Sequence, residues 1–348
     1  MIDHLVKVHQ ELGGLKTPII HIAGSKGKGT TANLLGKILE LSGKKVGVFS
    51  SPFLYKAEEM AKVNGVPMDS MQAYVDRVQS VNADLSEFEN WTLASLLYFS
   101  EQDLDYVILE CGWGGLNDAT NIVSDKVLTI LGHIELEHTE VLGDSIEKIT
   151  QQKLGICRDG VPLITETNQS PDVFDVIVKE GYQPIIAARA ELGEHHPGSA
   201  GLALAAADQL GFVVTPEMYK ELCEYQLFGR FEIVNWGGHT IVLDGAHTYD
   251  SVYYLRDKAL SYALEHDLPE PIWCIHFLKD KRDDLPDLFP SGRTAWVNLK
   301  DLRAGTAPEF LAQTEPEEFL KKLKSHSPSF VVFVGSFKLV SAIKTMLK

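Results

Sequence analysis

A glycine- and lysine-rich segment near the start of the chain constrains the fold more than any other feature. It follows the apolar run 18–23 and precedes a helical pattern over 31–42, so strand, loop and helix come in the order that a phosphate-binding loop requires. Glycines let backbone N–H groups face phosphate oxygens, the helix start adds positive potential, and Lys28 can reach terminal phosphates. The predicted phosphate-binding residues are Gly24, Ser25, Lys26, Gly27, Lys28, Gly29, Thr30 and Thr31.

Two other interpretations of this loop fit less well. A turn that only caps a helix would not need the preceding strand, and a dinucleotide-binding loop would carry the third glycine of GxGxxG and no lysine at the helix entry. Gly29 occupies the position where phosphate loops usually have serine or threonine, and the hydroxyls follow at Thr30 and Thr31.

Buried strands and helical segments alternate along the rest of the chain. This rhythm predicts an α/β fold with a mostly parallel sheet covered by helices. The predicted strands are 18–23, 45–50, 106–111 and 127–130, followed after Gly237 by 240–243, 272–277, 295–299 and 330–334. The predicted helices are 31–42, 91–100, 145–156, 198–210 and 251–265.

The length of 348 residues corresponds to two domains at roughly 150 residues each. The alanine-rich helix 198–210 gives way to a break around Gly229, which places the boundary near 223–230. We therefore expect a phosphate-loop domain over residues 1–225 and a smaller, Rossmann-like α/β domain over residues 226–348.

Charge and composition narrow the classes of partner. With 32 basic and 48 acidic side chains the net charge is −16, so the average surface repels nucleic acid and anionic lipid. The start lacks a basic segment followed by an apolar one, no apolar run reaches the roughly 18 residues that span a bilayer, and the four cysteines form no CxxC pair. We expect a cytoplasmic protein with reduced thiols and no nucleic-acid or membrane partner.

The predicted phosphate-binding loop, residues 24–30 (GSKGKGT), resembles the GTNGKGS loop of folylpolyglutamate and dihydrofolate synthases, which belong to the Mur ligase superfamily. Further motifs are similar in the same order. Residues 51–54 (SPFL) resemble SPHL, 110–121 (ECGWGGLNDATN) resemble EVGLGGRLDATN, 137–139 (EHT) resemble DHT, 153–156 (KLGI) resemble KAGI, 228–232 (FGRFE) resemble PGRxE, and 244–247 (DGAH) resemble the start of DGAHNP. The shared order identifies the chain as a divergent, shortened member.

The resemblance implies a Mur-ligase-like central ATP-binding domain, a C-terminal ligase domain and an ATP-dependent carboxylate–amine ligase of one-carbon metabolism. In such enzymes ATP phosphorylates an acid, and an amine, such as that of glutamate, attacks the acyl phosphate. ATP and Mg²⁺ are the implied cofactors. Small-molecule substrates and a monomeric state are also implied.

The resemblance assigns Mg²⁺ ligation to Ser51, Glu110 and His138. Glu110 also closes a predicted buried strand, at the sheet edge where ligands of open α/β sheets bind. The resemblance further implies that Lys153 is carbamylated, which would turn a cation into an anionic bridge to a second magnesium. A hydrogen-bonded loop histidine and a solvated helix-face lysine are the alternatives for His138 and Lys153.

For the second domain the resemblance implies that Asp244 contacts the ribose, Arg230 the nucleotide phosphates and His247 the incoming amino acid. The expected catalytic residues are then Lys28, Lys153 and His247. A turn-forming aspartate and a surface histidine are the alternatives for Asp244 and His247.

Some positions depart from the family pattern, and these fall on the acceptor and base sides. They are Phe53, Leu116-Asn117, Phe228, Thr248-Tyr249, the segment 194–196 and Ser199. The stretch 165–193 is also shorter than in the folate enzymes. These differences predict that folates are poor substrates and that a less polar acid is preferred. A ligase for a non-folate acid and a nucleotide-binding protein without turnover remain open.

Overall fold

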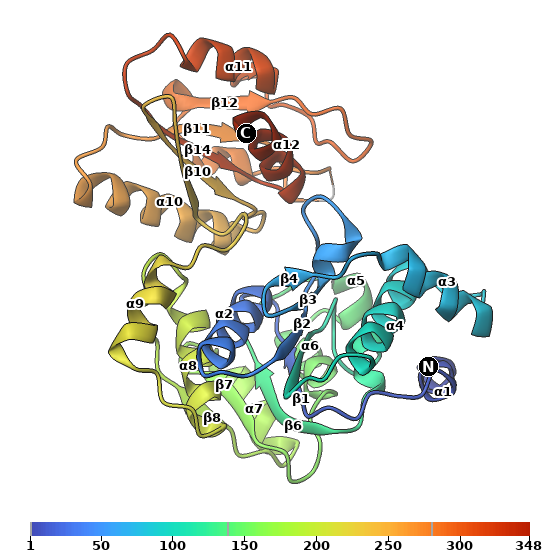
Figure 1. The fold of residues 1–348 in the computed structure, drawn as a ribbon. Coiled ribbons are helices and arrows are strands. Elements are labelled where there is room, and N and C mark those ends of the chain that lie inside the picture. The colour runs from blue at the N-terminus through green and yellow to red at the C-terminus, as the bar shows by residue number, and fades with distance from the viewer. Residues whose placement is uncertain (1, 138, 280) are drawn as a thin grey trace. The chain divides into compact units, whose positions relative to one another are not determined.

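The computed structural model describes residues 2–137, 139–279 and 281–348, and the chain forms two compact units that meet in sequence between Tyr225 and Gln226. Both are α/β units (Figure 1). The predicted fold class is confirmed.

The described part of the first unit contains an eight-stranded sheet in the order β4-β3-β2-β5-β1-β6-β7-β8. β2, β5, β1, β6, β7 and β8 pair in parallel. β3 and β4 add an antiparallel edge next to β2. Their bounds are β1 Ile19–Ala23, β2 Val46–Phe49, β3 Ala61–Val63, β4 Val66–Pro67, β5 Tyr106–Glu110, β6 Lys126–Leu131, β7 Leu163–Glu166 and β8 Ile185–Ala187.

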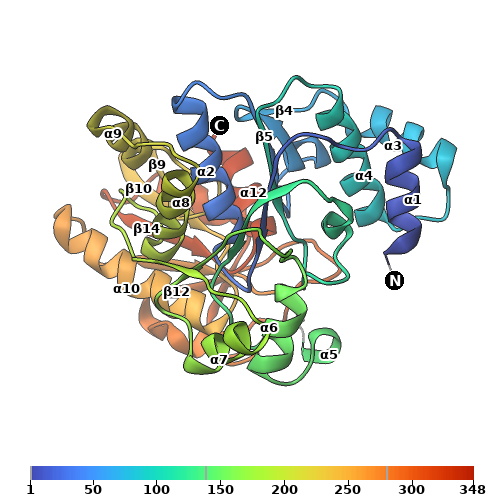
Figure 2. The same ribbon diagram turned by 90° about the horizontal axis from the view of Figure 1, so that it is seen from below.

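Helices cover both faces of this sheet (Figures 1 and 2). The helices are α1 Asp3–Glu11, α2 Lys28–Leu41, α3 Met71–Val81, α4 Glu87–Ser100, α5 Thr139–Leu142, α6 Ile146–Leu154, α7 Pro171–Lys179, α8 Pro197–Gln209 and α9 Pro216–Glu224, with short 3₁₀ turns at Ala57–Met60 and Ala119–Ile122. Alternate strand residues face opposite cores: Ile20 packs with α2 and α8, whereas Ile19 packs with α1, α3 and α4. This explains why β1 is apolar at consecutive positions.

In the described part of the second unit, six strands form a sheet in the order β13-β12-β11-β14-β10-β9, parallel except for β9. The strands are β9 Glu232–Trp236, β10 His239–Asp244, β11 Ile272–Ile275, β12 Thr294–Val297, β13 Ala312–Thr314 and β14 Phe330–Val334. The helices are α10 Tyr249–Glu265, α11 Pro316–Leu323 and α12 Phe337–Leu347, with 3₁₀ turns at Leu285–Leu288 and Ser291–Arg293.

Among the described residues, no helix combines the length and the apolar character that crossing a membrane requires.

Candidate functional site

The predicted phosphate loop connects β1, at the centre of the parallel sheet, to the start of α2. Gly24 and Gly27 adopt φ angles of +151° and +80°, which disfavour residues with a side chain. A Cβ would lie 2.9 Å from Gly132 Cα at the first position and 2.6 Å from Ser199 Oγ at the second. The loop is therefore a tight backbone cradle at the carboxyl edge of the strands, where open α/β sheets bind ligands.

The segment after β6 holds this cradle in place. The N–H groups of Ser25 and Lys26 donate to the His133 carbonyl at 2.7 and 3.2 Å. The Ser25 hydroxyl donates to the Glu135 carbonyl at 3.2 Å and lies 3.1 Å from the Glu135 N–H, which donates to it. Hydrogen bonds within the protein thus hold the shape of the loop.

The two hydroxyl residues at the start of α2 are both buried. Thr31 is enclosed completely, and its Oγ1 lies 3.5 Å from the Ser199 carbonyl, to which it donates. Ser199 belongs to the first turn of α8, and its own hydroxyl lies 3.4 Å from the carbonyl of Gly27.

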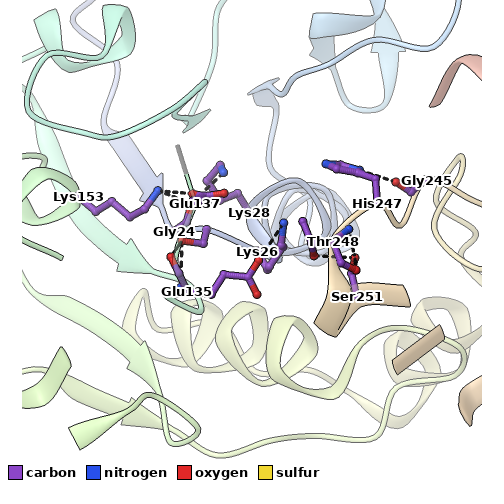
Figure 3. A network of polar contacts seen from close by, with 11 residues as sticks. Gly24, Lys26, Lys28, Glu135, Glu137, Lys153, Gly245, His247, Thr248 and Ser251 are labelled. Carbon is purple, nitrogen blue, oxygen red and sulfur yellow. Dashed lines mark hydrogen bonds and ion pairs between the residues drawn. The ribbon is translucent and has the colours of Figure 1, made fainter. Parts of the chain in front are cut away.

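Lys28 and Lys153 converge on one carbonyl of the loop (Figure 3). Their Nζ atoms donate to Gly24 O at 2.8 and 3.0 Å, and Lys153 also pairs with Glu137 at 2.8 Å. Lys153 is 0% exposed, which rules out the solvated-face alternative. Burial and the charge of Lys28 lower the pKa of Lys153, although Glu137 opposes this. Burial alone would raise the pKa of Glu137, but the ammonium groups of Lys153 and Lys28 hold it below its ordinary value.

Glu110 closes β5 and is buried beside the start of α2. Its Oε2 accepts the Ser51 N–H at 3.1 Å, and a Cβ on Gly29 would lie 3.1 Å from the same oxygen. The structure thus brings Ser51 and Glu110 to the phosphate loop, and the glycine at position 29 leaves room beside the carboxylate. Hard oxygen donors at this point fit Mg²⁺.

The third predicted metal ligand, His138, lies outside the described residues. Within the part of the chain that is described, no three His, Cys, Asp or Glu side chains gather as a metal site.

The loop after β5 packs against the helix turn that carries Lys153. A Cβ on Gly115 would lie 2.7 Å from the Lys153 carbonyl, and the Leu116 N–H donates to the Gln152 carbonyl at 2.7 Å. Buried Asp118 accepts the Trp113 N–H at 2.9 Å, and burial raises its pKa. Sequence reasoning did not single out Asp118, although an aspartate in a glycine-rich turn is a common turn former.

Several positions that depart from the family pattern lie in this first unit, among them Phe53 and Leu116. The ring of Phe53 packs edge-on against that of Trp91, with centroids 5.5 Å apart. Leu116 is 48% exposed and its loop neighbour Trp113 is 49% exposed. The exposed apolar side chains of Trp113 and Leu116 therefore lie on the loop that packs against the helix turn carrying Lys153.

In the second unit, Asp244 joins two turns. It accepts the N–H groups of Phe231 and Ala246, both at 2.7 Å, and burial raises its pKa. These two bonds show that the carboxylate supports the turns, and its oxygens retain lone pairs for a further donor. The Arg230 guanidinium lies 4.6 Å from the ring centre of Phe337.

His247 follows the same turn, and its Nδ1 lies 2.7 Å from the Gly245 carbonyl (Figure 3). Because a carbonyl can only accept, the proton of a neutral His247 resides on Nδ1. Its Nε2 then carries a lone pair that can accept a hydrogen bond.

Similarity to known proteins extends over nearly the whole chain. The Mur ligase middle domain family matches residues 22–236. A dihydrofolate synthase/folylpolyglutamate synthase of Escherichia coli is 30% identical over 388 residues, covering 99% of this chain and 91% of that relative. The enzyme of the same description from Bacillus subtilis is 32% identical over 266 residues, covering 72% of this chain and 59% of the relative.

The fold is also similar to a solved structure of a bifunctional folylpolyglutamate synthase/dihydrofolate synthase with Mn, AMPPNP and L-glutamate bound. The TM-score is 0.85 at 27% sequence identity, and the match covers 99% of this chain and 94% of that one.

Proposed function

Because the chain belongs to the Mur ligase superfamily and, within it, to the folylpolyglutamate and dihydrofolate synthase family, we propose that it uses ATP to join a carboxylic acid to glutamate. The observation that carries this proposal is the phosphate loop with Lys28, Lys153 and Glu110 around it at one sheet edge. The predictions of a monomer and of no nucleic-acid partner stay predictions.

Lys28 serves the first half-reaction in this proposal. ATP transfers its terminal phosphoryl group to the acid, and negative charge spreads over the transferring oxygens. Lys28 donates to Gly24 O and would exchange that carbonyl for a phosphate oxygen. Mg²⁺, held by Ser51, Glu110 and, by resemblance, His138, would neutralise further phosphate charge when bound.

The second half-reaction forms the amide. The amino group of glutamate attacks the acyl phosphate, phosphate leaves, and the nitrogen loses a proton. Arg230 and Asp244 are proposed to hold the nucleotide, and His247 to orient the amine through Nε2. The Nδ1–Gly245 contact fixes the imidazole for that role.

Lys153→Ala should abolish most turnover, and short carboxylates should restore part of it. The neutral amine is the form that reacts with CO₂ to give a carbamate, and burial lowers the pKa of Lys153, so this form costs less to reach than in an exposed lysine. Acetate or formate would supply the missing anionic oxygens. Turnover is measured with and without these acids. Lys148→Ala is the control because Lys148 lies on the same helix but is exposed. Full activity in untreated Lys153→Ala would refute the role.

The identity of the acid has two candidates. The names of the relatives favour a pteroate or folate acid, whereas Phe53 on Trp91 and the exposed Leu116 favour a less polar one. Purified protein should release ADP only when an acid and an amino acid are both present, and this test separates a ligase from a protein that merely binds nucleotide.

Comparing kcat/KM across acids at saturating ATP distinguishes the two candidates. Each changed contact alters discrimination by about 1–3 kcal/mol, roughly ten- to two-hundredfold. If the apolar side chains line the acid site, dihydropteroate and tetrahydrofolate should therefore be at least about tenfold poorer substrates than a less polar acid. A strong preference for a folate would contradict the altered-acid candidate and leave the ligase assignment intact.

A further inference from the structure

A second lysine of the phosphate loop is held by a carboxylate. Lys26 Nζ lies 3.1 Å from Glu135 Oε1, and the two side chains are only 27% and 13% exposed (Figure 3). Both residues belong to the first compact unit, which also contains the rest of the loop. Neither the acid–amine chemistry nor the resemblance assigns a role to Glu135.

The backbone fixes this pair in place. Glu135 exchanges two hydrogen bonds with the Ser25 hydroxyl, next to Lys26 in the chain. The Lys26 N–H is bound in turn to the His133 carbonyl at 3.2 Å. The two side chains are also less exposed than those of a surface pair such as Lys148 with Asp144. Solvent therefore screens the Lys26–Glu135 attraction less than that of the surface pair.

The lysines around the cradle differ in their partners. Lys28 donates to the neutral Gly24 carbonyl, which an anionic ligand displaces at little electrostatic cost. Lys153 is buried and already pairs with a carboxylate on its other side. Lys26, in the loop itself, is paired with the Glu135 carboxylate. A phosphate oxygen that approaches Lys26 meets the Glu135 carboxylate at hydrogen-bond distance from the same ammonium, and like charges repel. Phosphate and Glu135 thus compete for one cation.

We propose that Glu135 is an internal competitor for the nucleotide phosphates: Lys26 exchanges the Glu135 carboxylate for a phosphate oxygen, and the carboxylate limits nucleotide affinity. The exchange forms and breaks ion pairs only, with no covalent step. When ADP leaves, the Lys26–Glu135 ion pair forms again, so Glu135 also favours ADP release. The inference rests on the proposed function, because it concerns the site that would bind ATP.

Titration calorimetry with MgADP and with MgAMPPNP tests the competition on four proteins: the natural chain, Glu135→Gln, Lys26→Met and the double variant. Glu135→Gln keeps the size and the backbone contacts but removes the charge. We expect it to bind MgADP about two- to fivefold more tightly, as loss of a competing ion pair predicts. Lys26→Met should bind more weakly, and in the Lys26→Met background the Glu135→Gln change should have no effect.

Asp144→Asn is the matched control, because it removes the exposed partner of Lys148 away from the loop and should leave nucleotide affinity unchanged. Thermal unfolding of every variant verifies folding. Weaker binding by Glu135→Gln, or an unchanged affinity, would overturn the competitor role. An unchanged affinity in Lys26→Met would show that Lys26 does not contact phosphate and would overturn it as well. Failure of the natural chain to bind either nucleotide would instead overturn the proposed function itself.

Discussion

Replacing Lys28 with alanine should lower kcat by at least about a hundredfold while the protein stays folded, because loss of one preorganised donor to a charged transition state typically costs about 10²–10³ in rate. Lys28 is the first residue of α2, and its ammonium group contacts the loop carbonyl of Gly24 rather than the hydrophobic core. The phosphoryl group in transfer depends on such charge because the protein does little covalent chemistry in this step. ADP release in the presence of acid and glutamate measures the effect.

The control for this prediction lies on the same helix. Lys37 pairs with Glu40 one turn on, at 2.9 Å, away from the loop. Lys37→Ala should therefore keep most of the activity, and circular dichroism should show the same helical content in both variants. A kcat of Lys28→Ala equal to that of the natural protein would contradict the phosphate-loop assignment.

The strands that the sequence predicts best are those buried on both faces. All five residues of β1 are buried, and β14 shows the same pattern, so apolar runs mark them. β3, β4 and β8 contain two or three residues each and are only partly buried, which leaves no apolar run to detect. α4 begins at Glu87 rather than near 91, because Ser86 and Glu89 form a capping box that sequence analysis could have used.

The site residues that sequence spacing finds are those at strand ends. Glu110 closes β5 and Asp244 closes β10, and the carboxyl ends of parallel strands meet at one edge of a sheet. Sequence patterns could not predict the ion pairs Lys26–Glu135 and Lys153–Glu137, because these pairs depend on the path of the segment after β6. That path is set by backbone contacts to the loop, which no local pattern encodes.

The burial of Lys153 did have a local signal. Ile149, Thr150, Lys153 and Leu154 are the buried residues of α6, so Lys153 stands four residues after Ile149 on the inward stripe. A lysine at such a position either reaches a polar partner or loses its charge. Here it reaches both Glu137 and the loop, which is why helical periodicity and motif resemblance select the same residue.

Glu110→Gln should reduce divalent-metal-dependent turnover by orders of magnitude, because a neutral amide offers a hard cation far less field than a carboxylate. Glutamine keeps the side-chain length and an oxygen that can accept the Ser51 N–H, so the 3.1 Å contact with Oε2 has a replacement. The substitution thus removes charge with little change of shape. The Mg²⁺ concentration for half-maximal rate should rise together with the loss of rate.

Two measurements separate this effect from simple damage to the fold. Glu89→Gln removes one acidic charge from the same unit but keeps an N3 residue that can complete the capping box of α4, so its activity and Mg²⁺ requirement should stay close to natural. ADP titrated without a divalent cation should bind Glu110→Gln at least as tightly as the natural chain, because a carboxylate beside the loop repels phosphate when no metal lies between them. Turnover that proves independent of divalent cations in the natural protein would show that Ser51 and Glu110 are not metal ligands.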